Sequence, residues 1–361
     1  MAEEYVVKVA DGVPESFART RAPQRPALRL GLVQQRWHAD PAEHQAALTQ
    51  GIVLAAGQGA AIVCLQELTL SPYFAITAEG PAALGVEPEP LEDGPTIQFA
   101  RRAAAESNVY VHASLFERAD REDGLGYNTA ILVAPDGALV QRTRKLHIPV
   151  TAGYYEDKYF RRGPASGEGD PYPVVEVGFS ARSGGGAGAA VAGADAGQAG
   201  GAPAAAGGAV QAGGALAASG GATVKLGLPT CWDQWFPELA RAYSLHGAEV
   251  LIYPTAIGSE PDHPGFDTEP LWQQVIVGNG IANGTFMVAV NRIGTEPPLE
   301  FYGSSFISDP YGRILVQAPR DRPAVLVADL DLDQRGDWLE LFPFLTTRRP
   351  DTYGSLVDRE A

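Results

Sequence analysis

The sequence predicts an α/β protein built on mixed β-sheets. From Leu28 onward, short runs of aliphatic and β-branched residues alternate with segments that carry helix start and stop signals. Hairpin turn residues in each half of the chain add antiparallel strand pairs. Because the two halves repeat a similar order of elements, the sequence favours two sheets packed face to face with helices outside.

The expected strands are short and apolar. They cover residues 28–33, 61–65, 109–115, 129–133, 138–140, 224–228, 250–253, 286–290 and 324–328. Hairpin turns are expected at 135–137 and 308–312. Helices are expected at 41–57, 95–107, 236–246 and 270–283. Pro237 and Gly247 mark the start and the end of the third helix.

Changes in composition divide the chain into an extension, a domain and a tail. Residues 1–26 are polar and contain several prolines, so we expect an N-terminal extension outside the core. A single domain is expected over 27–345, followed by a tail over 346–361. Residues 181–222 are mostly Gly and Ala, which supply too little apolar side chain to offset the entropy of ordering. We therefore expect a disordered surface insertion there, with a partner-binding loop as the alternative.

Composition argues against several classes of protein. The formal net charge of −16 disfavours nucleic acid and anionic membrane surfaces as partners. No apolar run is long enough to span a membrane, and the first residues do not resemble a signal peptide. Two cysteines without paired spacing argue against a disulfide framework, and together these features predict a cytoplasmic location. The six histidines lack metal-binding spacing, so neither a metal nor a cofactor is expected.

Three reactive side chains, Glu67, Lys145 and Cys231, each follow the end of an apolar strand. Ligands of α/β sheets gather at such ends. Together the three groups could hydrolyse an amide: the carboxylate takes the thiol proton, the thiolate attacks the carbonyl, and the ammonium stabilises the oxyanion. Taken singly, each has an ordinary alternative as a surface charge or, for the cysteine, a small buried hydrophobe. Spacing alone does not bring them together.

These three segments, in this chain order, resemble the signature of the nitrilase-like carbon–nitrogen hydrolases. The resemblance runs from about residue 28 to 345, excluding the insertion. It implies a four-layer α-β-β-α sandwich, with Glu67 as general base, Lys145 as oxyanion stabiliser and Cys231 as nucleophile. It further implies the backbone N–H of Trp232 as second oxyanion donor, and a second glutamate, Glu156, that orients Lys145 or Glu67. A homodimer or a larger homo-oligomer is also implied.

Within that family the text around the nucleophile, residues 231–238, resembles the N-carbamoylputrescine amidase branch, as do 253–260 and 291–294. Family members that act on N-carbamoyl amino acids tend to place an arginine a few residues after the cysteine, whereas this chain has Asp233, Gln234 and Trp235 there. A substrate carboxylate would therefore lack its bidentate partner, and a substrate ammonium would meet acidic and aromatic groups. The candidate contacts are Trp235, Glu260, Asp262 and Glu296, each with packing or surface charge as the alternative.

We therefore expect a thiol amidohydrolase that cleaves N-carbamoylputrescine, a cationic N-carbamoyl amine of polyamine synthesis. The same chemistry on a β-ureidopropionase or ω-amidase substrate is the first alternative, and a weakly active subunit that binds a partner through the insertion is the second. A papain-like hydrolase fits less well, because no histidine lies in a suitable context. His147 is expected to be structural and Cys64 to be core. Pro229, two residues before the cysteine, predicts a distorted or edge approach to the nucleophile.

Overall fold

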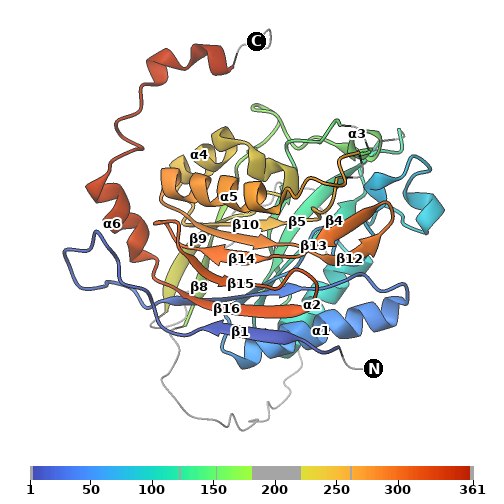
Figure 1. Cartoon of the computed structure of the whole chain (residues 1–361), viewed down its shortest axis with the longest axis horizontal. Helices are drawn as coiled ribbons and strands as arrows, with labels where there is room; N and C mark the ends of the chain where they lie inside the picture. Colours follow the sequence, from blue (N-terminus) through green and yellow to red (C-terminus); the bar gives the residue numbers. More distant parts are fainter. Residues whose placement is uncertain (1–2, 122, 152, 181–220, 261, 358–361) are drawn as a thin grey trace, which may run out of the picture.

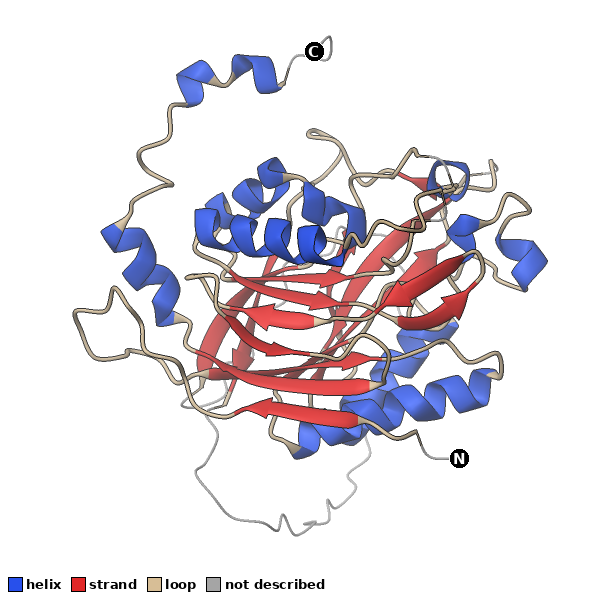
Figure 2. Ribbon diagram, viewed as in Figure 1, coloured by secondary structure: helices blue, strands red, loops and turns tan. Residues whose placement is uncertain are grey.

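The computed structural model describes residues 3–121, 123–151, 153–180, 221–260 and 262–357. Two large β-sheets pack face to face, and helices cover both outer faces (Figure 1). The colouring by secondary structure in Figure 2 makes the layers plain, with the strands stacked between two sets of helices. The predicted α-β-β-α sandwich is confirmed. The predicted insertion lies outside the described residues, apart from its last two.

The first sheet has the strand order β1-β16-β2-β3-β4-β5-β6, with β7 paired to β5. Its strands are β1 (Val6–Ala10), β2 (Leu28–Gln34), β3 (Ile62–Cys64), β4 (Tyr110–Glu117), β5 (Gly126–Val133), β6 (Leu139–Arg144), β7 (Phe160–Arg161) and β16 (Ala324–Leu330). β2, β3 and β4 run parallel, so the carboxyl ends of β2, β3 and β4 lie at the same edge. That edge carries Glu67.

The second sheet has the order β15-β14-β11-β10-β9-β8, and a separate two-stranded ribbon pairs β12 with β13. The strands are β8 (Val174–Phe179), β9 (Ala222–Gly227), β10 (Val250–Pro254), β11 (Phe286–Val290), β12 (Ile293–Glu296), β13 (Leu299–Tyr302), β14 (Phe306–Ser308) and β15 (Ile314–Gln317). Parallel pairing of β9, β10 and β11 again aligns their carboxyl ends. Aliphatic side chains from the facing surfaces of both sheets form the central core.

Helices α1 (Pro41–Gly57) and α2 (Pro95–Ser107) pack on the outer face of the first sheet. Helices α4 (Pro237–Leu245) and α5 (Glu269–Asn283) pack on the outer face of the second. The remaining helical segments are α3 (Glu156–Tyr159), α6 (Asp333–Leu341), η1 (Phe74–Ile76), η2 (Pro81–Leu84), η3 (Cys231–Trp235), η4 (Pro350–Thr352) and η5 (Gly354–Leu356). The start of α1 follows from its capping residue, because the Asp40 carboxylate accepts hydrogen bonds from the first N–H groups of that helix.

Part of the expected N-terminal extension instead belongs to the first sheet. Strand β1 pairs in parallel with β16, so Val6 lies opposite Ala324 and Ala10 opposite Ala328. The short valine-rich run of β1 is interrupted by Lys8 and followed by polar residues and prolines, so the local signal for a strand is weak. The core therefore reaches into residues 1–26, while the other domain boundaries remain predictions.

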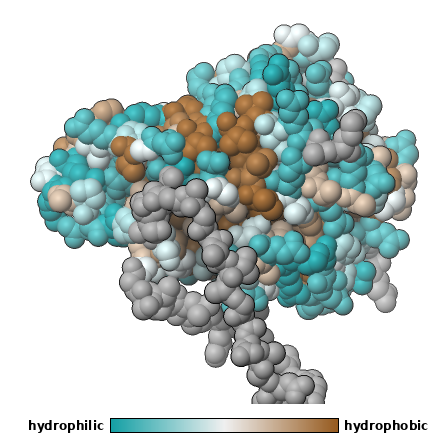
Figure 3. Space-filling model, turned by 90° about the horizontal axis from the view of Figure 1, so that it is seen from below, coloured by the Kyte–Doolittle hydropathy of each residue, from teal (hydrophilic) through white to brown (hydrophobic). Residues whose placement is uncertain are grey.

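The surface is largely polar. Figure 3, seen from below, shows polar residues over most of this face and an apolar strip near its centre. No helix in the described residues is long and apolar enough to cross a membrane.

Candidate active site

The three predicted reactive residues come together between the carboxyl ends of the two sheets. Cys231 opens η3 in a left-handed backbone conformation, with φ at 39°. Such a conformation is strained for a non-glycine residue and is typical of functional turns. Strand β9 already ends at Gly227, so Pro229 lies in the connection and removes no hydrogen bond from the ladder. The effect of Pro229 on the approach to Cys231 stays a prediction.

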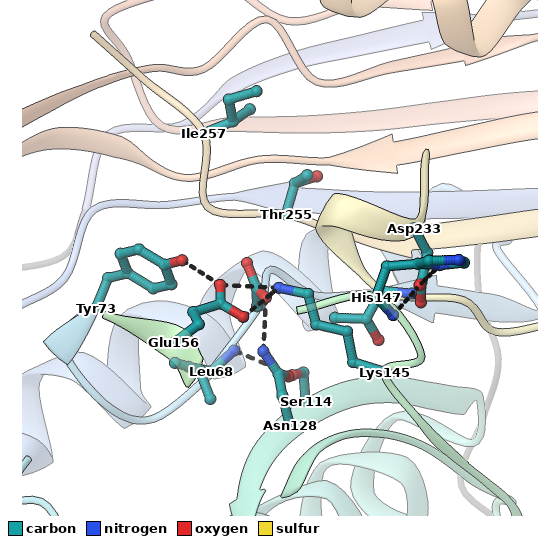
Figure 4. Close-up of polar contacts among 12 residues, drawn as sticks. Leu68, Tyr73, Ser114, Asn128, Lys145, His147, Glu156, Asp233, Thr255 and Ile257 are labelled. Carbon is teal, nitrogen blue, oxygen red and sulfur yellow. Dashed lines mark hydrogen bonds and ion pairs between the residues drawn. The ribbon is translucent and has the colours of Figure 1, made fainter. Parts of the chain in front are cut away.

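Lys145 is the fully buried cation of the site. Its Nζ donates to both oxygens of Glu156, at 2.8 and 2.7 Å, and to Oε1 of Glu67 at 3.1 Å (Figure 4). Burial lowers the pKa of Lys145, but the negative charges of Glu156 and Glu67 outweigh it and hold that pKa above its ordinary value. The ammonium is therefore present at neutral pH.

The two oxygens of Glu67 have different environments. Oε1 accepts hydrogen bonds from Asn128 Nδ2, at 2.7 Å, and from Lys145. Oε2 is buried and has no hydrogen-bond partner among the described residues. One oxygen thus fixes the orientation of the carboxylate, and the other is available to accept a proton.

Glu156 begins the short helix α3 and is fully buried. Its Oε1 accepts a 2.5 Å hydrogen bond from the hydroxyl of Tyr73. Burial raises the pKa of Glu156, Lys145 lowers it, and the Glu67 charge raises it, with a net rise. Glu156 therefore contacts the Lys145 ammonium, and the orienting role expected for it stays a prediction.

The Cys231 thiol lies close to these charges. Burial raises the pKa of Cys231 well above its ordinary value, Glu67 raises it further, and Lys145 opposes the rise. The resting thiol is therefore protonated, and its attack on a carbonyl requires a base.

Asp233 joins the nucleophile to the segment that carries Lys145. Its carboxylate accepts from the N–H of Thr230 at 3.1 Å and from the N–H and Nδ1 of His147 at 2.9 and 2.8 Å. The His147 ring also stacks on Phe236, with centroids 3.7 Å apart. The contacts of His147 are thus those of a structural residue, as expected. The Asp233 carboxylate is already occupied by hydrogen bonds to His147 and Thr230.

A cavity of about 290 Å³ opens from Cys231 toward the surface. Its walls are apolar and aromatic, with carboxylates at two places and no Lys or Arg among the described residues that line it. The lining residues are Tyr73, Pro149, Tyr154, Glu156, Cys231, Trp232, Gln234, Trp235, Ala256, Ile257, Glu260, Phe266, Thr268 and Leu271.

Of the predicted substrate contacts, Trp235 and Glu260 line this cavity. Glu260 is half-buried; burial raises its pKa, and the nearby His263 opposes the rise. Asp262 is exposed and lies outside the lining. Glu296 accepts hydrogen bonds from Arg292 and from the N–H of Tyr73, so its carboxylate is already occupied. Two of the four residues therefore line the cavity, and contact with a substrate stays a prediction for them.

Several site residues escaped the sequence analysis. Asn128 and Tyr73 contact the charged groups directly, and Tyr154, Phe266 and Leu271 shape the cavity. Asn128 could have been suspected, because it is a polar residue at the start of a strand that continues as an apolar run. Tyr73, Tyr154 and Phe266 lie in loops and Leu271 lies in the first turn of α5, and their approach to the site depends on how these elements pack.

Comparison with known proteins places this geometry in a family. The model of the family described as carbon-nitrogen hydrolase matches residues 29–340. An N-carbamoylputrescine amidase of Arabidopsis thaliana is 33% identical over 83% of this chain and 85% of its own length. A citrullinase of Francisella tularensis is 29% identical over 91% and 98%. The crystal structure of a carbon-nitrogen hydrolase from Helicobacter pylori G27 superposes with a TM-score of 0.69 and 28% identity, covering 93% and 99%. The chain belongs to the carbon-nitrogen hydrolase family and is a hydrolase of carbon–nitrogen bonds.

Proposed function

We propose that the protein hydrolyses the carbamoyl group of N-carbamoylputrescine to putrescine, ammonia and carbon dioxide, a reaction of polyamine synthesis. The observation that carries the substrate assignment is the cavity lining. Glu260 and aromatic side chains suit a distal ammonium, and no described lining residue could pair with a distal carboxylate. N-carbamoylputrescine presents a neutral ureido group at one end and an ammonium at the other.

The first half of the reaction forms a covalent adduct. The free Oε2 of Glu67 takes the thiol proton while the sulfur of Cys231 attacks the ureido carbon. Lys145 and the N–H of Trp232 stabilise the resulting oxyanion, since the first N–H groups of a helical turn lack acceptors within that turn. Glu67 then gives its proton to the leaving nitrogen, the tetrahedral carbon–nitrogen bond breaks, and a carbonyl bound to sulfur remains.

The second half releases the adduct. Glu67 removes a proton from water, the hydroxide adds to the carbonyl, and the carbon–sulfur bond breaks with return of the proton to the thiolate. The released product is a carbamic acid, which loses carbon dioxide as its second carbon–nitrogen bond breaks and its proton moves to nitrogen. The final products are one amine, one ammonia and carbon dioxide. The proton transfer moves one negative charge from the Glu67 carboxylate to sulfur, beside the Lys145 ammonium, and creates no new charge.

Citrulline is the strongest competing substrate, because one relative is named a citrullinase. β-Ureidopropionase of Arabidopsis thaliana, 24% identical, adds N-carbamoyl-β-alanine to the comparison. Both compounds carry a carboxylate, for which the described lining offers no cation.

Ammonia release from N-carbamoylputrescine, citrulline, N-carbamoyl-β-alanine and a simple ω-amide tests the proposal. We expect the highest kcat/KM with N-carbamoylputrescine. A preference for either carboxylate compound would contradict the substrate assignment, and a preference for the ω-amide would contradict the ureido specificity.

A further inference from the structure

Arg292 is a fully buried cation that the proposed chemistry does not use. It follows β11 of the second sheet and reaches across to the first. One terminal nitrogen, NH2, donates to the carbonyl oxygens of Glu67, Leu68 and Ser71 at 2.6, 3.2 and 3.4 Å. The other, NH1, donates to Oε1 of Glu296 at 2.6 Å. A planar guanidinium suits this double task, because its donors diverge in fixed directions.

The segment that Arg292 contacts is the one that carries the proposed base. Residues 67–73 leave β3 through a tight turn in which Leu68 has a left-handed φ of 47°. A non-glycine residue holds this conformation only when its surroundings impose it. The carbonyl contacts to Arg292 lie on both sides of that strained residue, so they fix the backbone from which the Glu67 side chain projects.

Glu296 extends the contact to the other end of the segment. Its Oε2 accepts a 2.6 Å hydrogen bond from the N–H of Tyr73, whose hydroxyl in turn donates to Glu156. The Arg292–Glu296 pair is therefore linked through the backbone to Glu67, and through the Tyr73 side chain to Glu156. These two carboxylates are the ones that flank the Lys145 ammonium.

We propose that Arg292 and Glu296 are positioning residues that set the geometry of the Glu67–Lys145–Glu156 network from the opposite sheet. This inference rests on the proposed role of Glu67 as base. Both Glu296 oxygens accept from N–H groups, and the pair is shielded from water, with side-chain exposures of 0% and 12%. A small displacement of a base in such a site lowers the rate of the chemical step more than it weakens substrate binding.

Glu296→Gln is the sharpest variant, because it keeps the shape of the side chain and changes one acceptor into a donor. That amide group must face a donor, either Arg292 or the Tyr73 N–H. We expect kcat to fall by about tenfold to a hundredfold, with KM within about twofold of the unmodified enzyme. Glu296→Asp is shorter but keeps both accepting oxygens, so we expect its kcat to exceed that of Glu296→Gln. A role in packing alone predicts the reverse order.

The matched control is the Arg29–Asp329 pair, which joins β2 to β16 with side-chain exposures of 4% and 18%. Asp329→Asn removes the charge from a comparable buried pair that does not contact residues 67–73. We expect it to lower the melting temperature without lowering kcat. If Glu296→Gln and Asp329→Asn lower kcat equally at equal loss of thermal stability, the proposed positioning role is overturned.

Two further measurements separate this inference from the proposed function. Glu67→Gln should abolish turnover; if it remains active, both the base assignment and the positioning role fall. If the unmodified enzyme hydrolyses none of the panel compounds, only the substrate assignment fails. The crystal structure of Glu296→Gln then decides: a displaced 67–73 segment with a lengthened Glu67–Lys145 contact supports the positioning role, and an unmoved segment overturns it.

Discussion

The two ends of the cavity differ in how their charges are held. Behind the reacting end, Glu67, Lys145 and Glu156 are fully buried, and the lysine is hydrogen-bonded to both carboxylates. At the outer end, Glu260 is half-buried among aromatic and aliphatic walls. The hydrogen bonds behind the reacting end therefore fix the positions of its charged groups. At the outer end, we expect a single substitution to be enough to alter which ligand binds. The proposed chemistry and the proposed substrate choice thus depend on different residues of one site.

The largest effect is expected from removing the nucleophile. Cys231→Ala should lower kcat by at least about 10⁴-fold, because no other group can form the covalent adduct. Cys64→Ala is the matched control: that thiol is fully buried in β3, in the core between the sheets, and should leave kcat unchanged. Steady-state ammonia release and circular dichroism check both variants. Residual turnover in Cys231→Ala would break the assignment of the reacting end.

A smaller loss is expected from Glu156→Gln. The change removes one of the two carboxylates that raise the pKa of Lys145. Burial, which lowers that pKa, is then opposed by Glu67 alone, and the side chain also loses the hydrogen-bond partner that holds its position. We expect kcat to fall about 10²-fold to 10³-fold, as when an oxyanion donor is lost. Glu117→Gln is the control, because Glu117 pairs with Arg144, next to Lys145, outside the cavity lining. Equal losses in the two variants would contradict a specific role for Glu156.

At the outer end, Glu260→Gln should change binding and leave the chemical step intact. We expect KM for N-carbamoylputrescine to rise about tenfold with kcat nearly unchanged, and the relative kcat/KM for citrulline to improve. Asp262→Asn, two residues away and exposed, should change neither parameter. A fall in kcat without a rise in KM would show that the two ends are not separable.

The last prediction concerns folding stability instead of turnover, and it tests the effect of burying a histidine that has no hydrogen-bond partner in the described chain. His112, in β4, is fully buried, and neither ring nitrogen has a hydrogen-bond partner in the described chain. Burial lowers its pKa from 6.5 to about 3, so below pH 6.5 the unfolded chain binds a proton that the folded protein refuses. Stability present above pH 6.5 is therefore lost as the pH falls toward 3, by about 1.4 kcal/mol per pH unit. Urea unfolding between pH 7 and pH 4 should show a shallower loss in His112→Leu; equal slopes would contradict this.

The core strands and the order of Glu67, Lys145 and Cys231 could be predicted because each depends on local sequence. An apolar run identifies a strand wherever it pairs, and a reactive residue just after it marks a strand end. Strand β1 also contains a short valine-rich run, but Lys8 interrupts it and polar, proline-rich residues follow it, so the sequence places it in the extension. Its pairing with β16 is visible only in the structure.

The side-chain contacts between the two sheets could not be predicted from the sequence either. Glu296 was expected at the substrate ammonium on the strength of its charge, but charge does not reveal direction, and its carboxylate faces Arg292 and Tyr73. Glu260 lines the cavity and Asp262 does not, although two residues separate them and both are acidic. Loop conformation decides between them, and it is set by packing against distant elements.

The position of β16 inside the first sheet affects how this sheet can form during translation. This strand, among the last elements of the described chain, lies between β1 and β2, which are the first. While the chain emerges from the ribosome, β2 therefore keeps one edge without its partner until residues 324–330 have been synthesised. An unpaired edge is open to pairing with other chains. The nascent chain is thus exposed to misassembly for most of its translation, and slowing its final stretch prolongs that exposure.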